Sequence, residues 1–337
     1  MTADRVLLTG ATGFVGGALY PHLRHAGYEI RGGTRDPERA ARHMPDRDFV
    51  HYEALDPVAT RNAMSGCRVA YYLVHGMGEQ PAGAEGVPEE DYEERERRAA
   101  TIFVAAAERA DVERIVYLGG IPPRGEASKH LRSRLNTGEI LRGGAVSCIE
   151  LRASMIVGSG SASWQIVRDL ATRLPVMVLP QWLKSQSEPV WIDDVAAALE
   201  AAASDDLWDS RHFVVPGPDR LSAREILRTV ARLQSMDPVM IDVPLVTPAL
   251  SSHWISLVTR ADEALAAELV EGLTSDIVSG PEDTPYWSRM AHQPIPFEEA
   301  VRRTLATEDE TDRSLSTRLV ERAARAITRR PSDEQPP

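Results

Sequence analysis

The feature that most constrains the fold is an alternation of short apolar runs with longer segments of helical periodicity. Val6–Thr9 predicts a buried strand, residues 14–26 have a helical pattern, and Glu29–Thr34 predicts a second strand. The same alternation continues with strands predicted at Phe49–Glu53, Val69–Val74, Arg114–Leu118 and Ser147–Arg152, and with helices predicted at 37–43, 58–65, 89–110 and 130–143. Strands that alternate with helices form a parallel, doubly wound sheet, so we predict an α/β protein.

A glycine-rich loop joins the first predicted strand to the first predicted helix, where residues Gly10–Gly17 read GATGFVGG. Backbone N–H groups and a helix N-terminus can approach a pyrophosphate at such a loop, because the glycines carry no side chain that would block it. We therefore predict a Rossmann core that binds a dinucleotide, with a purely structural turn as the alternative. The cofactor-binding residues predicted in this loop are Gly10, Thr12, Gly13, Phe14, Val15 and Gly16.

The regular alternation loosens after Arg152. Further helices are predicted at 162–173, 193–203, 222–232, 246–258 and 260–272, and further strands at His212–Val215 and Val239–Val243. We predict an NAD(P)-binding Rossmann core over 1–160, then the remaining Rossmann elements interleaved with a smaller, mainly helical C-terminal lobe over 161–310. Residues 311–337 form a charged tail with a basic amphipathic segment, Arg313–Arg330, which we interpret as a solvated surface helix; contact with a partner or a membrane surface is the alternative.

Charge and cysteine content narrow the choice of partners. Lys and Arg number 38 against 50 Asp and Glu, and the resulting net charge of −12 disfavours nucleic acid. Cys67 and Cys148 are far apart and match no metal-ligand spacing, so we predict neither a metal site nor a disulfide.

The sequence has no secretory signal and no uncharged apolar run of about 18 residues, so we expect a cytoplasmic protein without a membrane span. The expected partner is a small-molecule substrate; the oligomeric state is left open.

Several acidic residues have a structural explanation at helix starts. Asp36 and Asp56 each precede a proline and are predicted N-caps, and the pair Asp193-Asp194 is assigned the same role. Other enzyme classes lack their motifs: there is no usable GxSxG elbow, no Walker P-loop and no HExxH.

The glycine loop TGATGFVG, with its GxxGxxG spacing, closely resembles the fingerprint of extended and atypical short-chain dehydrogenases/reductases. The resemblance extends over roughly residues 4–305. It is strongest with the NAD(P)H-binding, NmrA-like branch, whose members the following stretches resemble: AYYLVHGMG (70–78), ERIVYLGGI (113–121), HLRSRLNTGEIL (130–141), LRASMIVGSGSAS (151–163) and PIPFEEAVRRTL (294–305).

Cofactor choice is indicated at the end of the second strand, where an acid binds the ribose 2′-hydroxyl of NAD and arginine pairs with the 2′-phosphate of NADP. This chain has Arg35 there, so we predict that NADP(H) is preferred over NAD(H); a solvated charge before a helix is the alternative for Arg35. The resemblance implies that Glu53 contacts the adenine amine and that Ser154 lies against the nicotinamide. Residues at the carboxyl end of the fourth strand, Leu73, Val74 and His75, are predicted to line the ribose edge.

The Ser-Tyr-Lys triad of typical family members is absent. Leu118-Gly119-Gly120 stands in the serine region, and His130 and Arg134 occupy the positions of the tyrosine and lysine. Four-residue spacing on a helix would put both side chains on one face, where imidazole could donate a proton and guanidinium could hold ribose hydroxyls. An ordinary solvated helix face is the equal alternative, and His75 is a competing proton donor.

The sequence therefore favours an NADP(H)-dependent oxidoreductase that transfers hydride to or from a small organic carbonyl or conjugated double bond. The alternative is a non-catalytic NAD(P)-binding redox sensor or scaffold, which the loss of all three triad residues favours. A nucleotide-sugar epimerase or dehydratase is less favoured, since those reactions rely on the missing tyrosine.

Overall fold

Seven parallel strands form the central sheet of the computed structural model, in the order β11-β6-β5-β4-β1-β2-β3. The structure describes residues 4–74, 92–125, 127–173, 176–180, 184–207, 209–236, 238–243 and 275–309. The strands of this sheet are β1 (Arg5–Thr9), β2 (Glu29–Thr34), β3 (Asp48–His51), β4 (Val69–Tyr72), β5 (Arg114–Gly120), β6 (Ser147–Ala153) and β11 (Arg211–Val214). The predicted doubly wound α/β sheet is confirmed.

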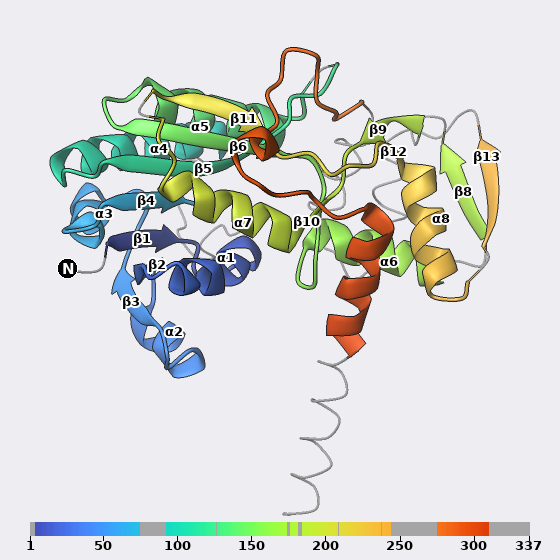
Figure 1. The fold of residues 1–337 in the computed structure, drawn as a ribbon, viewed down its shortest axis with the longest axis horizontal. Coiled ribbons are helices and arrows are strands. Elements are labelled where there is room, and N and C mark those ends of the chain that lie inside the picture. Colours follow the sequence, from blue (N-terminus) through green and yellow to red (C-terminus); the bar gives the residue numbers. More distant parts are fainter. Residues whose placement is uncertain are drawn as a thin grey trace, which may run out of the picture.

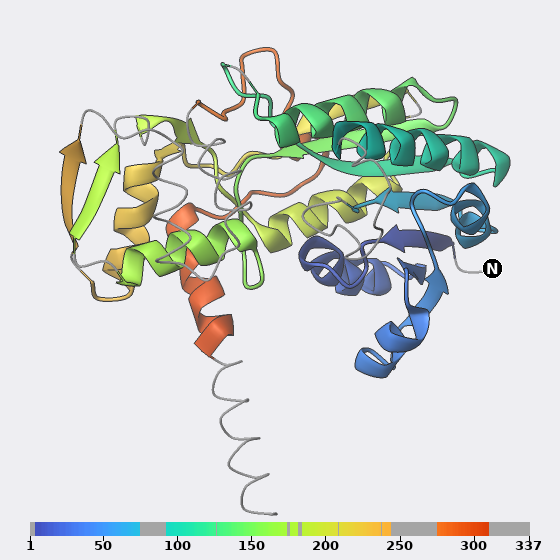
Figure 2. The same cartoon turned by 180° about the vertical axis from the view of Figure 1, so that it is seen from behind.

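Helices cover both faces of the sheet (Figures 1 and 2). One face carries α3 (Pro57–Met64), α4 (Tyr92–Arg109) and α5 (Lys129–Gly143), and the other carries α1 (Phe14–His25) and α7 (Ile192–Ala203); α2 (Pro37–His43) follows β2. The central strands β4, β5 and β6 are buried at every position. Burial on both faces explains why the apolar residues of β4 and β5 are continuous rather than alternating.

The C-terminal lobe lies beyond the carboxyl ends of the strands (Figure 1). Its described helices are α6 (Ala162–Arg173), α8 (Ala223–Leu233) and residues 297–309, which share an apolar cluster around Trp164, Val230 and Phe297. Paired short strands complete it: β7 (Ile156–Val157) with β10 (Val190–Trp191), β9 (Gln186–Ser187) with β12 (Leu221–Ser222), and β8 (Val176–Pro180) with β13 (Val239–Val243). A 3-10 turn, η2, spans Tyr286–Arg289.

The fourth strand ends earlier than the sequence predicts. β4 ends at Tyr72, two residues before the predicted end at Val74, because the Leu73 amide donates to the hydroxyl of Thr9 instead of continuing the ladder. Asp36 and Asp56 cap α2 and α3 as predicted, accepting bonds from the Arg39 amide and from the amides of residues 58 and 59. The helices predicted at 246–258 and 260–272 and the tail 311–337 lie outside the described residues.

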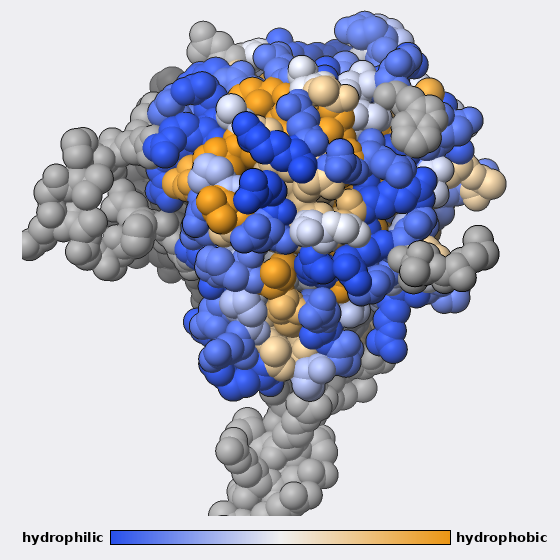
Figure 3. Space-filling model, turned by 90° about the vertical axis from the view of Figure 1, so that its left-hand side faces the viewer, coloured by the Kyte–Doolittle hydropathy of each residue, from blue (hydrophilic) through white to orange (hydrophobic). Residues whose placement is uncertain are grey.

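The opposite end of the molecule carries the amino ends of the strands. Figure 3 shows small apolar groups there, interrupted by hydrophilic side chains.

No helix within the described ranges is long and apolar enough to cross a membrane.

Candidate functional site

The glycine loop closes on itself tightly between β1 and α1. Gly10 has φ +68°, and its carbonyl oxygen accepts a bond from the Gly13 amide at 2.9 Å. A Cβ at Gly10 would lie 2.6 Å from the Leu73 carbonyl oxygen, and a Cβ at Gly16 would lie 2.3 Å from the Gly10 carbonyl oxygen. Both contacts are with backbone and allow no side chain. Gly13 is the N-cap of α1 and no side chain caps it, so the first amides of α1 face an exposed surface at Thr12 and Gly13.

A buried threonine that the sequence analysis did not single out ties this loop to the next strand. The Thr9 hydroxyl donates to the Tyr71 carbonyl oxygen at 2.7 Å and accepts from the Leu73 amide at 3.0 Å. These bonds place Leu73 directly beside Gly10 and lead the chain to Val74. Of the predicted ribose-edge residues, Leu73 thus lies at the cradle, and Val74 packs against the apolar cluster that contains Tyr72 and Phe103. His75 lies outside the described residues.

The adenosine side of the candidate site is formed where β2 and β3 end. Arg35 is exposed directly after β2, and its backbone carbonyl bonds the Nδ1 of His51 at 3.1 Å. Glu53 is half-buried in a turn after β3, and its backbone carbonyl accepts from the Asp56 amide and from the hydroxyl of Thr60. Arg35 and Glu53 therefore come from adjacent strands at the same edge of the sheet.

The predicted His130 and Arg134 lie on α5, which starts after the carboxyl end of β5. The ring of His130 packs on that of Tyr92, the first residue of α4, with centroids 4.6 Å apart at 58°. The hydroxyl of buried Tyr117 donates to the Arg134 carbonyl oxygen at 3.0 Å, which anchors this turn of the helix to β5. Burial raises the pKa of Tyr117, so this hydroxyl keeps its proton.

The region of the missing serine is filled by a neighbouring side chain. A Cβ at Gly120 would lie 2.6 Å from Cδ1 of Leu131, so Leu131 occupies the space in front of this position. Ser133 is 2% exposed and points into the core rather than toward the helix surface.

Residues 153–155 are fixed by the lobe. The Ser154 hydroxyl donates to the Glu188 carbonyl oxygen at 2.6 Å, which leaves its oxygen as an acceptor. The Met155 carbonyl accepts from the Val190 amide at 2.9 Å. Phe14 of the glycine loop reaches the same region, because a Cβ at Gly158 would lie 2.9 Å from its Cζ. Cradle and lobe are therefore in direct contact at Phe14.

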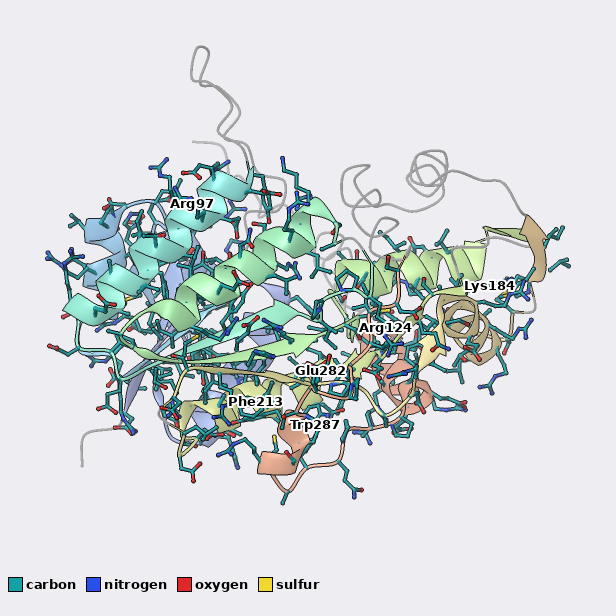
Figure 4. All side chains as sticks on the ribbon, turned by 90° about the horizontal axis from the view of Figure 1, so that it is seen from above. Arg97, Arg124, Lys184, Phe213, Glu282 and Trp287 are labelled. Atoms are coloured by element: carbon teal, nitrogen blue, oxygen red, sulfur yellow. The ribbon has the colours of Figure 1, made fainter. Side chains whose placement is uncertain are left out.

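The lobe also meets the loop after β5. The Arg124 amide donates to the Asp276 carbonyl oxygen at 3.0 Å, and the Asp276 carboxylate accepts from the Gln186 amide at 2.8 Å. Figure 4 shows Arg124 between the parallel sheet and the lobe. The carboxyl edge of the sheet is thus bounded by the lobe on this side.

The capping role predicted for Asp193 and Asp194 is wrong. The N-cap of α7 is Trp191, without a side-chain cap bond. Asp193 instead contacts the ring of His22 on α1 at 3.2 Å, and Asp194 contacts His292 at 2.7 Å and accepts from the Ile295 amide at 3.0 Å. Both carboxylates join α7 to distant segments, and such partners have no local sequence signal.

A buried ion cluster on β6 was not predicted from the sequence. Glu150 is fully buried and accepts from Arg142 on α5 at 2.7 Å and from Arg152 at 2.8 Å. Its carboxylate occupies space that two glycines leave open, since a Cβ at Gly119 or Gly138 would lie 2.7 or 2.5 Å from Oε1. This cluster holds α5 against the sheet.

Across the described residues, no three His, Cys, Asp or Glu side chains are grouped as metal ligands. The site consists of a glycine cradle, flanked by Arg35 and Glu53 on one side and by α5 on the other.

A family model for NAD(P)H-binding domains matches residues 10–169, which contain the cradle and the strands around it. This match agrees with the resemblance to atypical short-chain dehydrogenases/reductases, and the predicted NAD(P)H-binding domain with an α/β fold is confirmed. The comparison with curated proteins gives no match.

Solved structures with the same fold include reductases, epimerases and dehydratases. The Citrobacter sp. triphenylmethane reductase complexed with NADP(H) superposes with a TM-score of 0.69 at 15% identity, over 89% of this chain and 99% of that one. The Thermotoga maritima UDP-glucose 4-epimerase with UDP-glucose gives 0.66 at 12% identity, over 91% and 99%. The Streptomyces venezuelae dTDP-glucose 4,6-dehydratase with NAD bound gives 0.65 at 15% identity, over 90% and 96%.

Proposed function

We propose that this protein is an NADP(H)-dependent oxidoreductase that transfers hydride to or from a small organic carbonyl or conjugated double bond. The observation that carries the proposal is the cradle. Gly10 and Gly16 leave no room for side chains, and the uncapped start of α1 offers its amides to a pyrophosphate. The arginine after β2 supports NADP(H), since guanidinium pairs with a phosphate at the ribose 2′-position. Two buried free cysteines, Cys67 and Cys148, agree with a reducing, cytoplasmic location.

The residues assigned to the cofactor divide by its parts. The amides around Gly13, Phe14 and Val15 hold the pyrophosphate, with Thr12 beside them. Arg35 holds the 2′-phosphate and Glu53 the adenine amine, while Leu73, Val74 and His75 line the ribose edge. The nicotinamide, when bound, would supply hydride chemistry, and Ser154 is the residue assigned to its side of the site.

His130 is assigned to proton transfer. It lies in the first turn of α5, supported by the ring of Tyr92, and Arg134 follows one turn later. A protonated imidazole can donate to a substrate oxygen near neutral pH, and the guanidinium can hold the ribose hydroxyls beside it. His75 remains the second candidate donor.

The alternative is a non-catalytic NAD(P)-binding sensor or scaffold. It is favoured by one observation: Leu131 fills the space in front of Gly120, so the serine region presents a methyl group instead of a hydroxyl.

The two functions are separated by single-turnover oxidation of bound NADPH against a panel of small aldehydes, ketones and enones. The oxidoreductase should oxidise NADPH with at least one of these, and His130→Ala should reduce the rate constant about 100-fold with an unchanged NADPH Kd. His43→Ala, on the surface helix α2, is the matched control. NADPH binding without oxidation by any member of the panel would favour the sensor or scaffold; oxidation unaffected by His130→Ala would remove His130 from the mechanism.

A further inference from the structure

An aromatic side chain of the glycine loop reaches the segment that leads into the C-terminal lobe. Phe14 is the first residue of α1 and is half-buried. A Cβ at Gly158 would lie 2.9 Å from Cζ of Phe14, and a Cβ at Gly160 would lie 3.6 Å from its Cδ2. The ring therefore lies against the turn that follows β7, residues 158–161, in which Gly158 has no room for a side chain.

The same turn leads directly into the first helix of the lobe, since Ser161 is the residue before α6. The Ser161 amide donates to the Gly158 carbonyl oxygen at 3.1 Å. Its hydroxyl donates to the Ile156 carbonyl oxygen at 2.9 Å and accepts from the Trp164 amide at 3.3 Å. Trp164 is fully buried in the apolar cluster that joins α6 to α8 and to residues 297–309. The position of the turn therefore sets the start of α6 and, through Trp164, its packing in the lobe.

The backbone of Phe14 belongs to the cofactor cradle. Its amide is among the first of α1, which have no acceptor within the helix and are proposed to hold the pyrophosphate. A pyrophosphate bound there would fix the backbone of Phe14 and so restrict where its ring can lie. Ile192, the first residue of α7, approaches the turn as well, because a Cβ at Gly158 would lie 2.6 Å from its Cγ2. With the ring held, Gly158 is confined between Phe14 and Ile192.

We propose that Phe14 couples occupancy of the cradle to the C-terminal lobe: a pyrophosphate at the start of α1 holds the ring against the turn 158–161 and thereby orders that turn and the start of α6. The inference rests on the proposed cofactor site and adds to it a control of the lobe by the cofactor. Because such coupling is reciprocal, a change in the turn must also alter the affinity of the cradle.

The first test is amide hydrogen exchange of residues 156–173, with and without saturating 2′-phospho-ADP-ribose. This probe carries the pyrophosphate and the 2′-phosphate but no nicotinamide, so it can act on the lobe only from the cradle side. We expect bound probe to slow exchange of the segment at least about threefold in the wild type and hardly at all in Phe14→Ala, measured at saturation of each protein. Val15→Ala is the matched control, because Val15 follows Phe14 but packs on the core of the sheet; it should keep the slowing.

The second test is a double-mutant cycle on the NADPH Kd with Phe14→Ala and Gly158→Ala. Gly158 is assigned no contact with the cofactor, so an added methyl group acts on the Kd through the turn. We expect Gly158→Ala to weaken NADPH binding about fivefold in the wild-type background, equivalent to about 1 kcal/mol. In the Phe14→Ala background the methyl group has room, and the effect should fall below about twofold. Ser159→Ala, at an exposed position of the same turn, should leave the Kd unchanged.

No slowing of exchange in the wild type, equal slowing in Phe14→Ala, or an effect of Gly158→Ala that is the same in both backgrounds would overturn the coupling while leaving the cofactor site intact. Failure of the wild type to bind either NADPH or the probe would overturn the proposed function itself, and the inference with it.

Discussion

Glycine is required at position 16 by a contact distance and not by backbone conformation. Its φ is not in the left-handed region, but a Cβ would lie 2.3 Å from the Gly10 carbonyl oxygen. The neighbouring Gly17 has no atom within 4 Å of the same position. Two adjacent glycines of one helix turn therefore differ completely in their tolerance of a methyl group.

Gly16→Ala should weaken NADPH binding by at least about 100-fold, roughly 2.7 kcal/mol, because the backbone of the cradle must move away from the pyrophosphate. Gly17→Ala should leave the Kd unchanged and raise the free energy of unfolding by about 0.5 kcal/mol, as expected for alanine in a helix. Fluorescence titration and chemical denaturation check the pair. Equal Kd values for the two variants would show that the contact at Gly16 does not shape the site.

At the scale of elements, α5 is held on the sheet by an ion cluster that a sequence pattern cannot reveal. Glu150 is a charged residue within a fully buried strand, and its two arginines come from α5 and from β6 itself. Because Gly119 and Gly138 make room for the carboxylate, the cluster fixes the distance between helix and strand. The helix so placed is the one that carries His130 and Arg134.

Gly138→Ala should destabilise the protein by about 2–3 kcal/mol, because its methyl group would overlap the buried carboxylate of Glu150 and strain the ion pairs. Gly143→Ala is the control, since that glycine ends α5 and a Cβ added there would meet no atom within 4 Å. Urea denaturation measures both. A loss below about 0.5 kcal/mol in Gly138→Ala would mean that α5 can shift without cost.

Most elements of the sheet could be predicted from the sequence, since strands buried on both faces are continuous apolar runs bounded by turns. The glycine loop was equally readable, because its spacing follows a strand and opens a helix. Strand pairs of two residues, such as β7 with β10, are too short for any periodicity. Thr9, Glu150, Asp193 and Asp194 were missed or misassigned, because their partners are more than 50 residues away or depend on the packed fold.

At the scale of the whole molecule, the start of α7 joins three parts of the chain. Asp193 reaches α1, whose first turn belongs to the cradle, and Asp194 reaches His292 and Ile295 just before the final described helix. α7 thus connects the cofactor core to the segment that closes the lobe.

The ion pair of His22 and Asp193 should make stability depend on pH. The hydrogen bond between the two side chains raises the pKa of His22 and lowers the pKa of Asp193. A raised histidine pKa contributes stability below the unfolded-state value of about 6.5, and that contribution is lost as pH rises through the folded-state value. Because the pKa of Asp193 is lowered, its contribution to stability is lost only in acid, when the carboxylate is protonated. The pair is therefore fully formed near pH 5.5.

His22→Gln should therefore lower the free energy of unfolding by about 0.5 kcal/mol at pH 5.5, a small value because the pair is partly exposed, and by almost nothing at pH 8.5. His25→Gln, an exposed histidine at the end of the same helix, should show no such difference. Denaturation curves at the two pH values decide this. A larger loss at pH 8.5 than at pH 5.5 would contradict the sign.

The most direct test of the central claim is a titration of the nucleotide-free protein with NADPH, NADH and NADP⁺, followed by tryptophan fluorescence and nicotinamide emission. We expect saturable binding of NADPH, with NADH at least about tenfold weaker at neutral pH, a difference of about 1.4 kcal/mol, and loss of that preference in Arg35→Ala. Absence of binding by all three nucleotides would contradict it, because the glycine loop would then be a structural turn and not a cofactor cradle.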